Sequence, residues 1–215
     1  MGGKNKQLLS LAGKSVIERS VSAFSDIAEV AGILVVVKEN EQMLFEQALA
    51  SINHCKVSIK VVPAGGETRQ QSVEQGLAFV PTETEYIAIH DGARPLIQKK
   101  DILQVFEVAK KTGGAVLGTM VKDTIKVISE KGDILSTPER STLFSAQTPQ
   151  AFRFSDYQEA LQIAKDRLIY FTDDAQLFEA VGKKVTAVQG SYSNIKITTP
   201  EDVKIAKELL SSIMA

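Results

Sequence analysis

A carboxylate and a guanidinium lie three positions apart in the segment His90-Asp91-Gly92-Ala93-Arg94-Pro95. The apolar run Tyr86 to Ile89 before it has the composition of a strand in the middle of a sheet, and the glycine and proline prevent this strand from continuing. In open parallel sheets, ligands bind at the carboxyl ends of strands. Asp91 there suits a metal ion or a ribose hydroxyl, and Arg94 suits a phosphate. The alternative is an Asp–Arg pair that only stabilises a turn.

A second candidate site is the glycine pair Gly65-Gly66, between a predicted strand over 58–62 and a predicted helix. Backbone N–H groups at such a junction can face a ligand, and glycines let the backbone approach a flat base closely. Arg69 and Ser72 are three residues apart and share one face of the first helical turn. A glycine pair alone more often makes only a turn.

The remaining polar residues at predicted strand ends and junctions are mostly cations and hydroxyls. With Asp91 and Arg94 they comprise Lys6, Thr124, Arg140, Thr148, Thr172 and Lys196. The set contains no convincing nucleophile, and neither His54 nor His90 is spaced for a metal site or a catalytic triad. This inventory indicates charge stabilisation at a phosphate, not covalent catalysis.

The elements that must position these residues alternate between helix and strand, which predicts an α/β domain with parallel crossover connections. Expected strands are 33–37, 58–62, 86–89, 115–120, 185–188 and 193–198. Ser15, Ser155 and Thr172-Asp173-Asp174 are expected to cap helices at their starts, and Gly113 caps one at its end. The helix over 39–52 is expected to present Met43, Leu44, Ala48 and Ile52 on its apolar side. Thr148-Pro149 is read as a turn.

Residues 122–148 interrupt this alternation with two short alternating stretches about Gly132-Asp133, which predicts a hairpin arm. Such arms commonly reach a second subunit, and we expect a homodimer through it. The alternative is a lid within one chain.

The length of 215 residues predicts a single domain, 1–215. The chain has 25 basic and 26 acidic residues and no long block of one sign. Bulk attraction to nucleic acid or to a membrane surface therefore has no support. No apolar run approaches the roughly 20 residues that a bilayer requires. The single cysteine, Cys55, excludes an internal disulfide and suits a reducing cytosol, so a cytoplasmic location is expected.

Several short motifs, in this order and spacing, resemble those of the 2-C-methyl-D-erythritol 4-phosphate cytidylyltransferases of the non-mevalonate isoprenoid pathway. The likeness covers essentially the whole chain. It rests on Lys6-Gln7, Gly65-Gly66-x-x-Arg69-x-x-Ser72-Val73, His90 to Pro95, Asp123-Thr124-x-Lys126, Arg140, Gln147 to Gln150, Thr172-Asp173-Asp174 and Asn194-Ile195-Lys196.

The resemblance implies a Rossmann-like nucleotidyltransferase with a mostly parallel sheet and a protruding β-hairpin arm. It would transfer CMP from CTP to 2-C-methyl-D-erythritol 4-phosphate with Mg²⁺. By this likeness Lys6 stabilises charge on the reacting phosphates, while Arg140 and Lys196 aim the attacking oxygen. CTP would be held by Gly66, Glu67, Ser72, Asp91 and Gly92, with Asp91 near the metal. The sugar-alcohol phosphate would be held by Arg94, Thr124, Thr148 and Thr172, with Thr124 and Arg140 drawn from the partner subunit.

Two departures from the family pattern stand out. The family begins with a strand and a loop of the form Ala-Ala-Gly-x-Gly-x-Arg, whereas this sequence starts at the methionine that follows, so we expect a preceding segment in the native protein. Gln176 occupies a position where the family has a serine. Two other functions stay open: a ribitol 5-phosphate cytidylyltransferase, which Gly92-Ala93 disfavours, and a non-catalytic CTP-binding protein.

Overall fold

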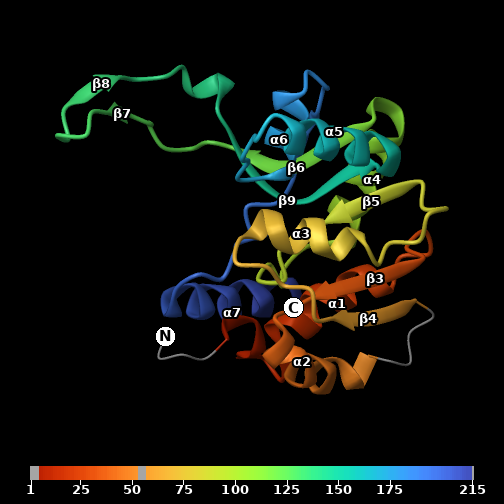
Figure 1. Ribbon diagram of the computed structural model, residues 1–215. Helices are drawn as coiled ribbons and strands as arrows, with labels where there is room; N and C mark the ends of the chain where they lie inside the picture. Colours follow the sequence, from red (N-terminus) through yellow and green to blue (C-terminus); the bar gives the residue numbers. More distant parts are fainter. Residues whose placement is uncertain (1–4, 53–56, 215) are drawn as a thin grey trace.

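The computed structural model describes residues 5–52 and 57–214 (Figure 1). His54 and Cys55, which the sequence analysis considered, lie outside the described residues.

Two separate sheets form the centre of the fold. The smaller pairs β3 (Gly32–Val36) with β4 (Ser58–Val62) in parallel. The larger has the order β10-β6-β9-β5 and consists of β5 (Tyr86–Ile89), β6 (Gly114–Met120), β9 (Phe144–Arg153) and β10 (Thr186–Gln189). β10 is parallel to β6, and both β5 and β6 are antiparallel to β9, so three strands point one way. The predicted α/β fold with a mostly parallel sheet is confirmed.

Helices cover both faces of the larger sheet (Figure 1). α1 (Val16–Ser25) and α4 (Lys99–Thr112) pack on one face. α3 (Arg69–Leu77), α5 (Phe154–Asp166) and α6 (Asp174–Ala180) pack on the other. The remaining helices are α2 (Gln42–Leu49), α7 (Pro200–Met214) and the 3-10 turns η1 (Lys6–Leu8), η2 (Glu39–Glu41), η3 (Ala50–Ile52) and η4 (Arg140–Thr142). The short strands β1 (Ser10–Leu11) and β2 (Lys14–Ser15) pair before α1.

Local signals explain where several helices begin and end. Ser15 forms a capping box with Glu18, as predicted for this start, and Gly113 ends α4 in the left-handed conformation at φ 89. The prediction that Ser155 caps α5 was wrong. The helix already begins at Phe154, and its N-cap is Arg153 without a side-chain hydrogen bond.

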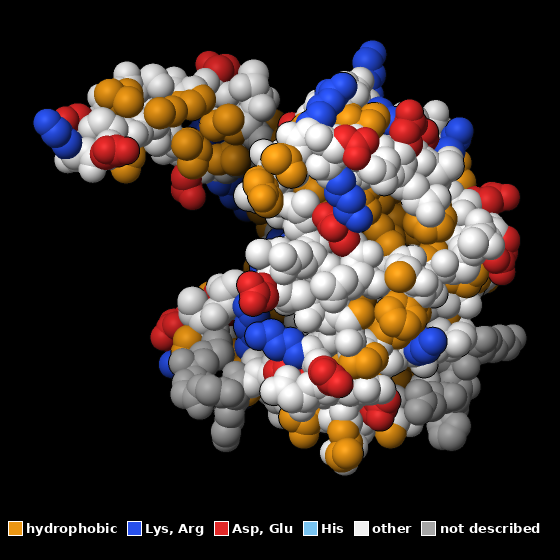
Figure 2. Space-filling model, in the orientation of Figure 1, with side chains coloured by type: hydrophobic (Ala, Val, Ile, Leu, Met, Phe, Trp, Pro, Cys, Tyr) orange, Lys and Arg blue, Asp and Glu red, His pale blue; other side chains and the backbone are white. Residues whose placement is uncertain are grey.

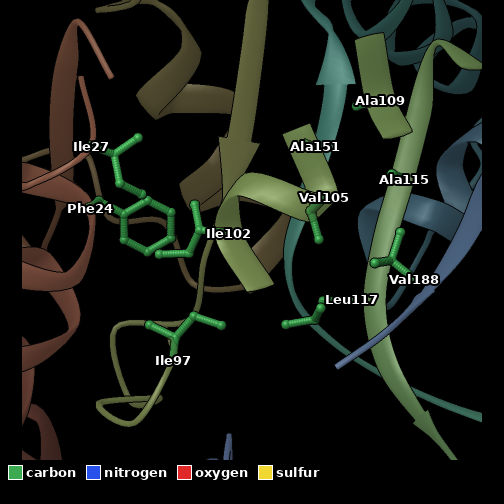
Figure 3. Close-up of a cluster of buried hydrophobic side chains, with 10 residues drawn as sticks. All are labelled: Phe24, Ile27, Ile97, Ile102, Val105, Ala109, Ala115, Leu117, Ala151 and Val188. Carbon is green, nitrogen blue, oxygen red and sulfur yellow. The ribbon is translucent and has the colours of Figure 1, made fainter. Parts of the chain in front are cut away.

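The core between α1, α4 and the larger sheet is built from alternating strand residues and one face of each helix (Figure 3). Ala151 faces this cluster, while its neighbour Phe152 faces α5 and α6 on the other side, as strand alternation requires. Phe152 stacks on Phe178 with ring centroids 4.4 Å apart.

The apolar face predicted for residues 39–52 was partly wrong. Met43 and Leu44 are exposed, whereas Phe45, Leu49 and Ile52 are buried against α1 and the smaller sheet. The segment is divided into η2, α2 and η3. Phe45, Leu49 and Ile52 keep the i, i+4, i+7 spacing of one helix face, so the buried face lies one position along from the predicted one.

The reading of Thr148-Pro149 as a turn was also wrong, because both residues lie within β9. The register of β9 against β6 shifts between Val116 and Gly118, opposite this point. A proline donates no ladder hydrogen bond and is tolerated at such a bulge.

The hairpin arm is present as β7 (Val127–Ile128) and β8 (Ile134–Ser136), paired antiparallel. It leaves the end of β6, returns into β9 and projects from the body of the molecule (Figure 1). Figure 2 shows hydrophobic side chains gathered along the arm and a hollow in the surface beneath it.

Candidate active site

Asp91 stands two residues after the end of β5 and is surrounded by three cations. Its Oδ2 accepts from Arg94 Nε at 3.1 Å and lies 3.1 Å from Lys196 Nζ, and Arg69 Nε lies 3.9 Å from Oδ1. Burial alone would raise the pKa of Asp91. Lys196, Arg94 and Arg69 together outweigh that effect and hold its pKa below the ordinary value. The site is therefore an ionised carboxylate within a cationic cluster.

Lys196 reaches Asp91 on an extended segment that follows β10. The segment is fixed to the loop after β5, because Ile197 N–H donates to Ala93 O at 2.8 Å and Arg94 Nη1 donates to Asn194 O at 2.8 Å. The prediction of a strand over 193–198 was wrong. The segment bonds to an irregular loop by isolated hydrogen bonds, and no described strand lies beside it to continue a ladder.

A partly buried histidine and a buried threonine hold the backbone of Asp91. Burial lowers the pKa of His90 to about 4, so the ring is neutral at neutral pH. Its Nε2 lies 3.3 Å from Arg94 O, which can only accept, so Nε2 carries the proton and Nδ1 accepts from the Thr148 hydroxyl at 3.0 Å. The Thr148 hydroxyl in turn accepts from Asp91 N–H at 3.0 Å. Thr148, which the resemblance expects to bind substrate, is only 4% exposed, and its hydroxyl forms hydrogen bonds with His90 and with the Asp91 backbone.

Thr148→Val is expected to lower the free energy of unfolding by about 1–3 kcal/mol, because it leaves the Asp91 N–H without a partner. Urea unfolding measures this change, and Thr82→Val, at an exposed loop position, is the matched control. Unchanged stability together with a raised KM for the acceptor would instead assign the hydroxyl to substrate binding.

The glycine pair opens α3 and is braced by the helix itself. Gly66 N–H donates to Ser72 Oγ at 3.0 Å, Glu67 N–H donates to Gln71 Oε1 at 2.9 Å, and Thr68 caps the helix. A side chain at Gly65 would collide with the backbone of Val37 and Lys38, so only glycine fits there. Ser72 therefore acts by shaping the loop around Gly66.

A pocket of about 510 Å³ opens beside this loop, lined by Lys38, Gly65, Gly66, Glu67, Gln71 and Gln75. Lys38 was not among the residues singled out from the sequence. It lies two residues after the end of β3, as Asp91 lies two residues after the end of β5, and that position could have identified it. Arg69, in the first turn of α3, follows the same loop in the chain, and its Nε lies 3.9 Å from Asp91 Oδ1.

The N-terminal turn also meets the site. A Cβ added at Gly92 would lie 3.2 Å from Gln7 Nε2, and the Ser20 hydroxyl donates to Gly92 O at 3.0 Å. Gln7 of η1 therefore lies beside the Asp91 loop, and Lys6 is its neighbour in the same turn. A role for Lys6 at the site stays a prediction.

Comparison with known proteins identifies the family of this chain. The family model described as "IspD: 2-C-methyl-D-erythritol 4-phosphate cytidylyltransferase" matches residues 1–212. The chain belongs to this family. A cytidylyltransferase of this name from Desulforamulus reducens is 40% identical over 205 residues, covering 95% of this chain and 87% of the relative. One from Bacillus licheniformis is 42% identical over 210 residues, covering 98% of this chain and 89% of the relative.

Solved structures of the family have the same fold. The 4-diphosphocytidyl-2C-methyl-D-erythritol synthase of Anaerococcus prevotii superposes with a TM-score of 0.87 at 30% identity, covering 95% of this chain and 93% of that one. The cytidylyltransferase of Thermus thermophilus gives a TM-score of 0.79 at 29% identity, covering 96% and 94%. The resemblance inferred from the motifs is confirmed, and the protein is a nucleotidyltransferase of isoprenoid biosynthesis.

Not every residue expected at the cytidylyltransferase site lies there within one chain. Thr124 and Arg140 are exposed on the arm, where Arg140 Nη1 donates to Lys122 O at 3.1 Å. Among the described residues, no contact joins either of them to the Asp91 cluster. Thr172 is exposed just before α6, and its hydroxyl donates to Gln176 Oε1 at 3.1 Å. Gln176, where this chain departs from the family pattern, therefore contacts Thr172, which is expected to bind the acceptor.

Sequence reasoning missed the importance of one residue of α6. Asp174 is fully buried and pairs with Arg69, while its neighbour Asp173 provides the N-cap by accepting from Gln176 N–H at 2.9 Å. An acid at a helix start ordinarily indicates a cap, and no sequence signal separates the two roles.

In the part of the chain that the structure describes, no helix is both long enough and apolar enough to span a bilayer.

Proposed function

We propose that the protein transfers CMP from CTP to 2-C-methyl-D-erythritol 4-phosphate, releasing pyrophosphate and forming 4-diphosphocytidyl-2-C-methyl-D-erythritol, without a covalent enzyme intermediate. The observation that carries the proposal is the cluster of Arg69, Arg94 and Lys196 around Asp91, beside the Gly65-Gly66 loop. The family relationship supports the choice of substrates.

In the proposed reaction, an oxygen of the acceptor phosphate attacks the α-phosphorus of CTP. A new P–O bond forms as the bond from the α-phosphorus to the α–β bridging oxygen breaks, and its electron pair leaves with pyrophosphate. The acceptor phosphate, with a second pKa of about 6, is largely ionised at neutral pH and needs no general base. What the protein must supply is in-line positioning of two polyanions against their repulsion.

The described residues divide this task between two sides of Asp91. The pocket beside the Gly65-Gly66 loop would hold the cytosine end of CTP, with Gly66 and Glu67 in its lining and Ser72 fixing the loop by accepting from the Gly66 N–H. Arg94 and Lys196 would face the acceptor phosphate, and Lys6 would stabilise charge on the triphosphate. Thr172 would contribute its hydroxyl from the start of α6 once it turns from Gln176.

Asp91 fits the role of the carboxylate beside Mg²⁺. Its Oδ2 lies 3.1 Å from both Arg94 Nε and Lys196 Nζ, whereas Arg69 Nε lies 3.9 Å from Oδ1, beyond hydrogen-bond range, and within the described residues no side-chain hydrogen bond reaches Oδ1. Among the described residues, no group of three or more metal-binding side chains forms. This suits Mg²⁺, which usually takes one or two carboxylates and completes its shell with substrate phosphates and water. When bound, Mg²⁺ neutralises phosphate charge and so favours attack at the α-phosphorus.

We also propose that the arm joins two copies of the chain into a homodimer. Ile128, Ile134 and Leu135 are 61%, 64% and 64% exposed in the single chain, which is costly for so many apolar side chains on one hairpin. A partner's arm would bring Thr124 and Arg140 to the acceptor side of the site. The protein is proposed to act in the cytoplasm, since one cysteine allows no internal disulfide.

The pair of substitutions Ile128→Asp and Ile134→Asp is expected to convert the dimer to a monomer, because both side chains would bury charge in the proposed interface. Size-exclusion chromatography with light scattering measures the mass, and Lys131→Ala at the tip of the hairpin is the control on the same element. Pyrophosphate release should fall together with dimerisation. A wild-type monomer, or a variant that remains dimeric, would contradict the proposed interface.

The activity itself is tested by pyrophosphate release from CTP and Mg²⁺ with each of two acceptors, 2-C-methyl-D-erythritol 4-phosphate and ribitol 5-phosphate. The proposal expects turnover with the first and little with the second. Preference for ribitol 5-phosphate would reassign the acceptor. Binding of CTP by calorimetry without pyrophosphate release would leave a non-catalytic CTP-binding protein.

A further inference from the structure

Asp174 carries a charge in the interior of the protein, beside the proposed active site. Its side chain is fully buried at the first residue of α6. The Tyr157 hydroxyl donates to Oδ1 at 2.7 Å, and the Arg69 guanidinium binds Oδ2 through Nη2. A buried carboxylate is strongly unfavourable unless it is paired in this way. Since Asp173 already caps α6, capping does not account for Asp174.

Asp174 has two partners: Tyr157 lies in the aromatic core, and Arg69 reaches toward Asp91. Tyr157 packs among Phe152 and Phe178 in the aromatic core, with ring centroids 5.6 Å and 6.1 Å away. Arg69 is partly exposed, and its Nε lies 3.9 Å from Asp91 Oδ1. This distance exceeds that of a hydrogen bond. Arg69 therefore stands beside Asp91 but is bonded to Asp174.

We propose that Asp174 is a positioning residue that retains Arg69 and thereby keeps Asp91 Oδ1 free for the divalent cation. If Asp174 lost its charge, Asp91 would be the nearest carboxylate to Arg69. A guanidinium favours a forked, hydrogen-bonded pair with a carboxylate. Arg69 would then move onto Asp91 and occupy Oδ1. The inference rests on the proposed function for its kinetic consequence, but the movement of Arg69 does not.

The test is Asp174→Asn, which keeps the shape of the side chain and its ability to accept from Tyr157. The Mg²⁺ concentration for half-maximal pyrophosphate release is expected to rise about 10- to 100-fold, the usual range for residues that orient metal ligands. Turnover at saturating Mg²⁺ should be largely recovered. Lys183→Gln, which removes the surface pairs with Asp156 and Glu159, is the control and should leave the Mg²⁺ requirement unchanged.

A second substitution separates this role from a merely structural one. Adding Arg69→Gln to Asp174→Asn removes the side chain that would occupy Oδ1, so the Mg²⁺ requirement should return toward that of the wild type. A purely structural role predicts that the double variant is at least as impaired as the single one. If Asp174→Asn does not fold, Tyr157→Phe weakens the same anchor, and the Mg²⁺ requirement should rise by a smaller factor.

A crystal structure of the Asp174→Asn variant gives a reading that is independent of activity. Arg69 is expected within hydrogen-bond distance of Asp91 Oδ1, with the surrounding fold unchanged. This result in a protein that releases no pyrophosphate would support the inference while the proposed function failed. Arg69 remaining in place, or an unchanged Mg²⁺ requirement in an active enzyme, would overturn it.

Discussion

Replacing Lys196 by alanine is expected to lower kcat about 100-fold or more, because loss of one preorganised charge-stabilising group typically raises a barrier by about 2.7–4 kcal/mol. Lys196 Nζ lies 3.1 Å from Asp91 and is held there by the bonds of its segment to the loop after β5. In the proposed reaction it faces the attacking phosphate, whose charge the protein must offset. Steady-state pyrophosphate release at saturating CTP and acceptor measures the change.

The loss should be catalytic and not structural. The Lys196 side chain is 40% exposed, and ion pairs with that degree of solvent access contribute at most about 1 kcal/mol to stability. Thermal unfolding should therefore change by only a few degrees. Lys204→Ala, at an exposed position of α7, is the matched control and should retain wild-type turnover. Near-normal turnover in Lys196→Ala would remove this lysine from the mechanism.

Asp91→Asn is expected to reduce kcat/KM by about 100- to 1000-fold, since it removes the proposed metal ligand, and a bound metal supplies several kcal/mol of charge stabilisation. It also leaves Arg69, Arg94 and Lys196 without their shared anion. The defect should be greatest at low Mg²⁺ and only partly relieved by raising the Mg²⁺ concentration. Asp166→Asn, exposed on α5, is the control.

The same substitution has an expected signature in pH-dependent stability. The pKa of Asp91 lies below its ordinary value of 3.8, so its ionised form stabilises the folded state above that pH. This contribution is lost as the pH falls below 3.8 toward the folded-state pKa. The wild type should therefore lose more stability on acidification than Asp91→Asn does, as measured by urea unfolding between pH 6 and pH 3. Parallel pH profiles for the two proteins, or unchanged activity at low Mg²⁺, would contradict the assigned role.

Much of the site could be predicted from the sequence because its residues occupy positions with local signals. Asp91 follows an apolar run and precedes a glycine, Gly66 lies between a strand and a capped helix, and the arm alternates about a glycine turn. These signals act over a few residues, where backbone geometry and hydrogen bonding are decided by neighbours. The wrong predictions, such as the turn at Thr148-Pro149 and the strand over 193–198, concern segments whose conformation depends on what packs beside them.

Local sequence patterns predicted the alternation of elements and the family, and they singled out Asp91, Arg94 and Lys196, which the fold brings together. Which other charges meet depends on the tertiary fold. Arg69 and Asp174 are separated by 105 positions, and Arg94 and its acceptor on Asn194 by 100. The tertiary fold also decided that Thr148 faces the protein and that Asp174, unlike Asp173, is buried. The physical reason is that burial and ion pairing depend on contacts between distant segments, and a carboxylate at a helix start has the same local pattern whether it faces water or an arginine.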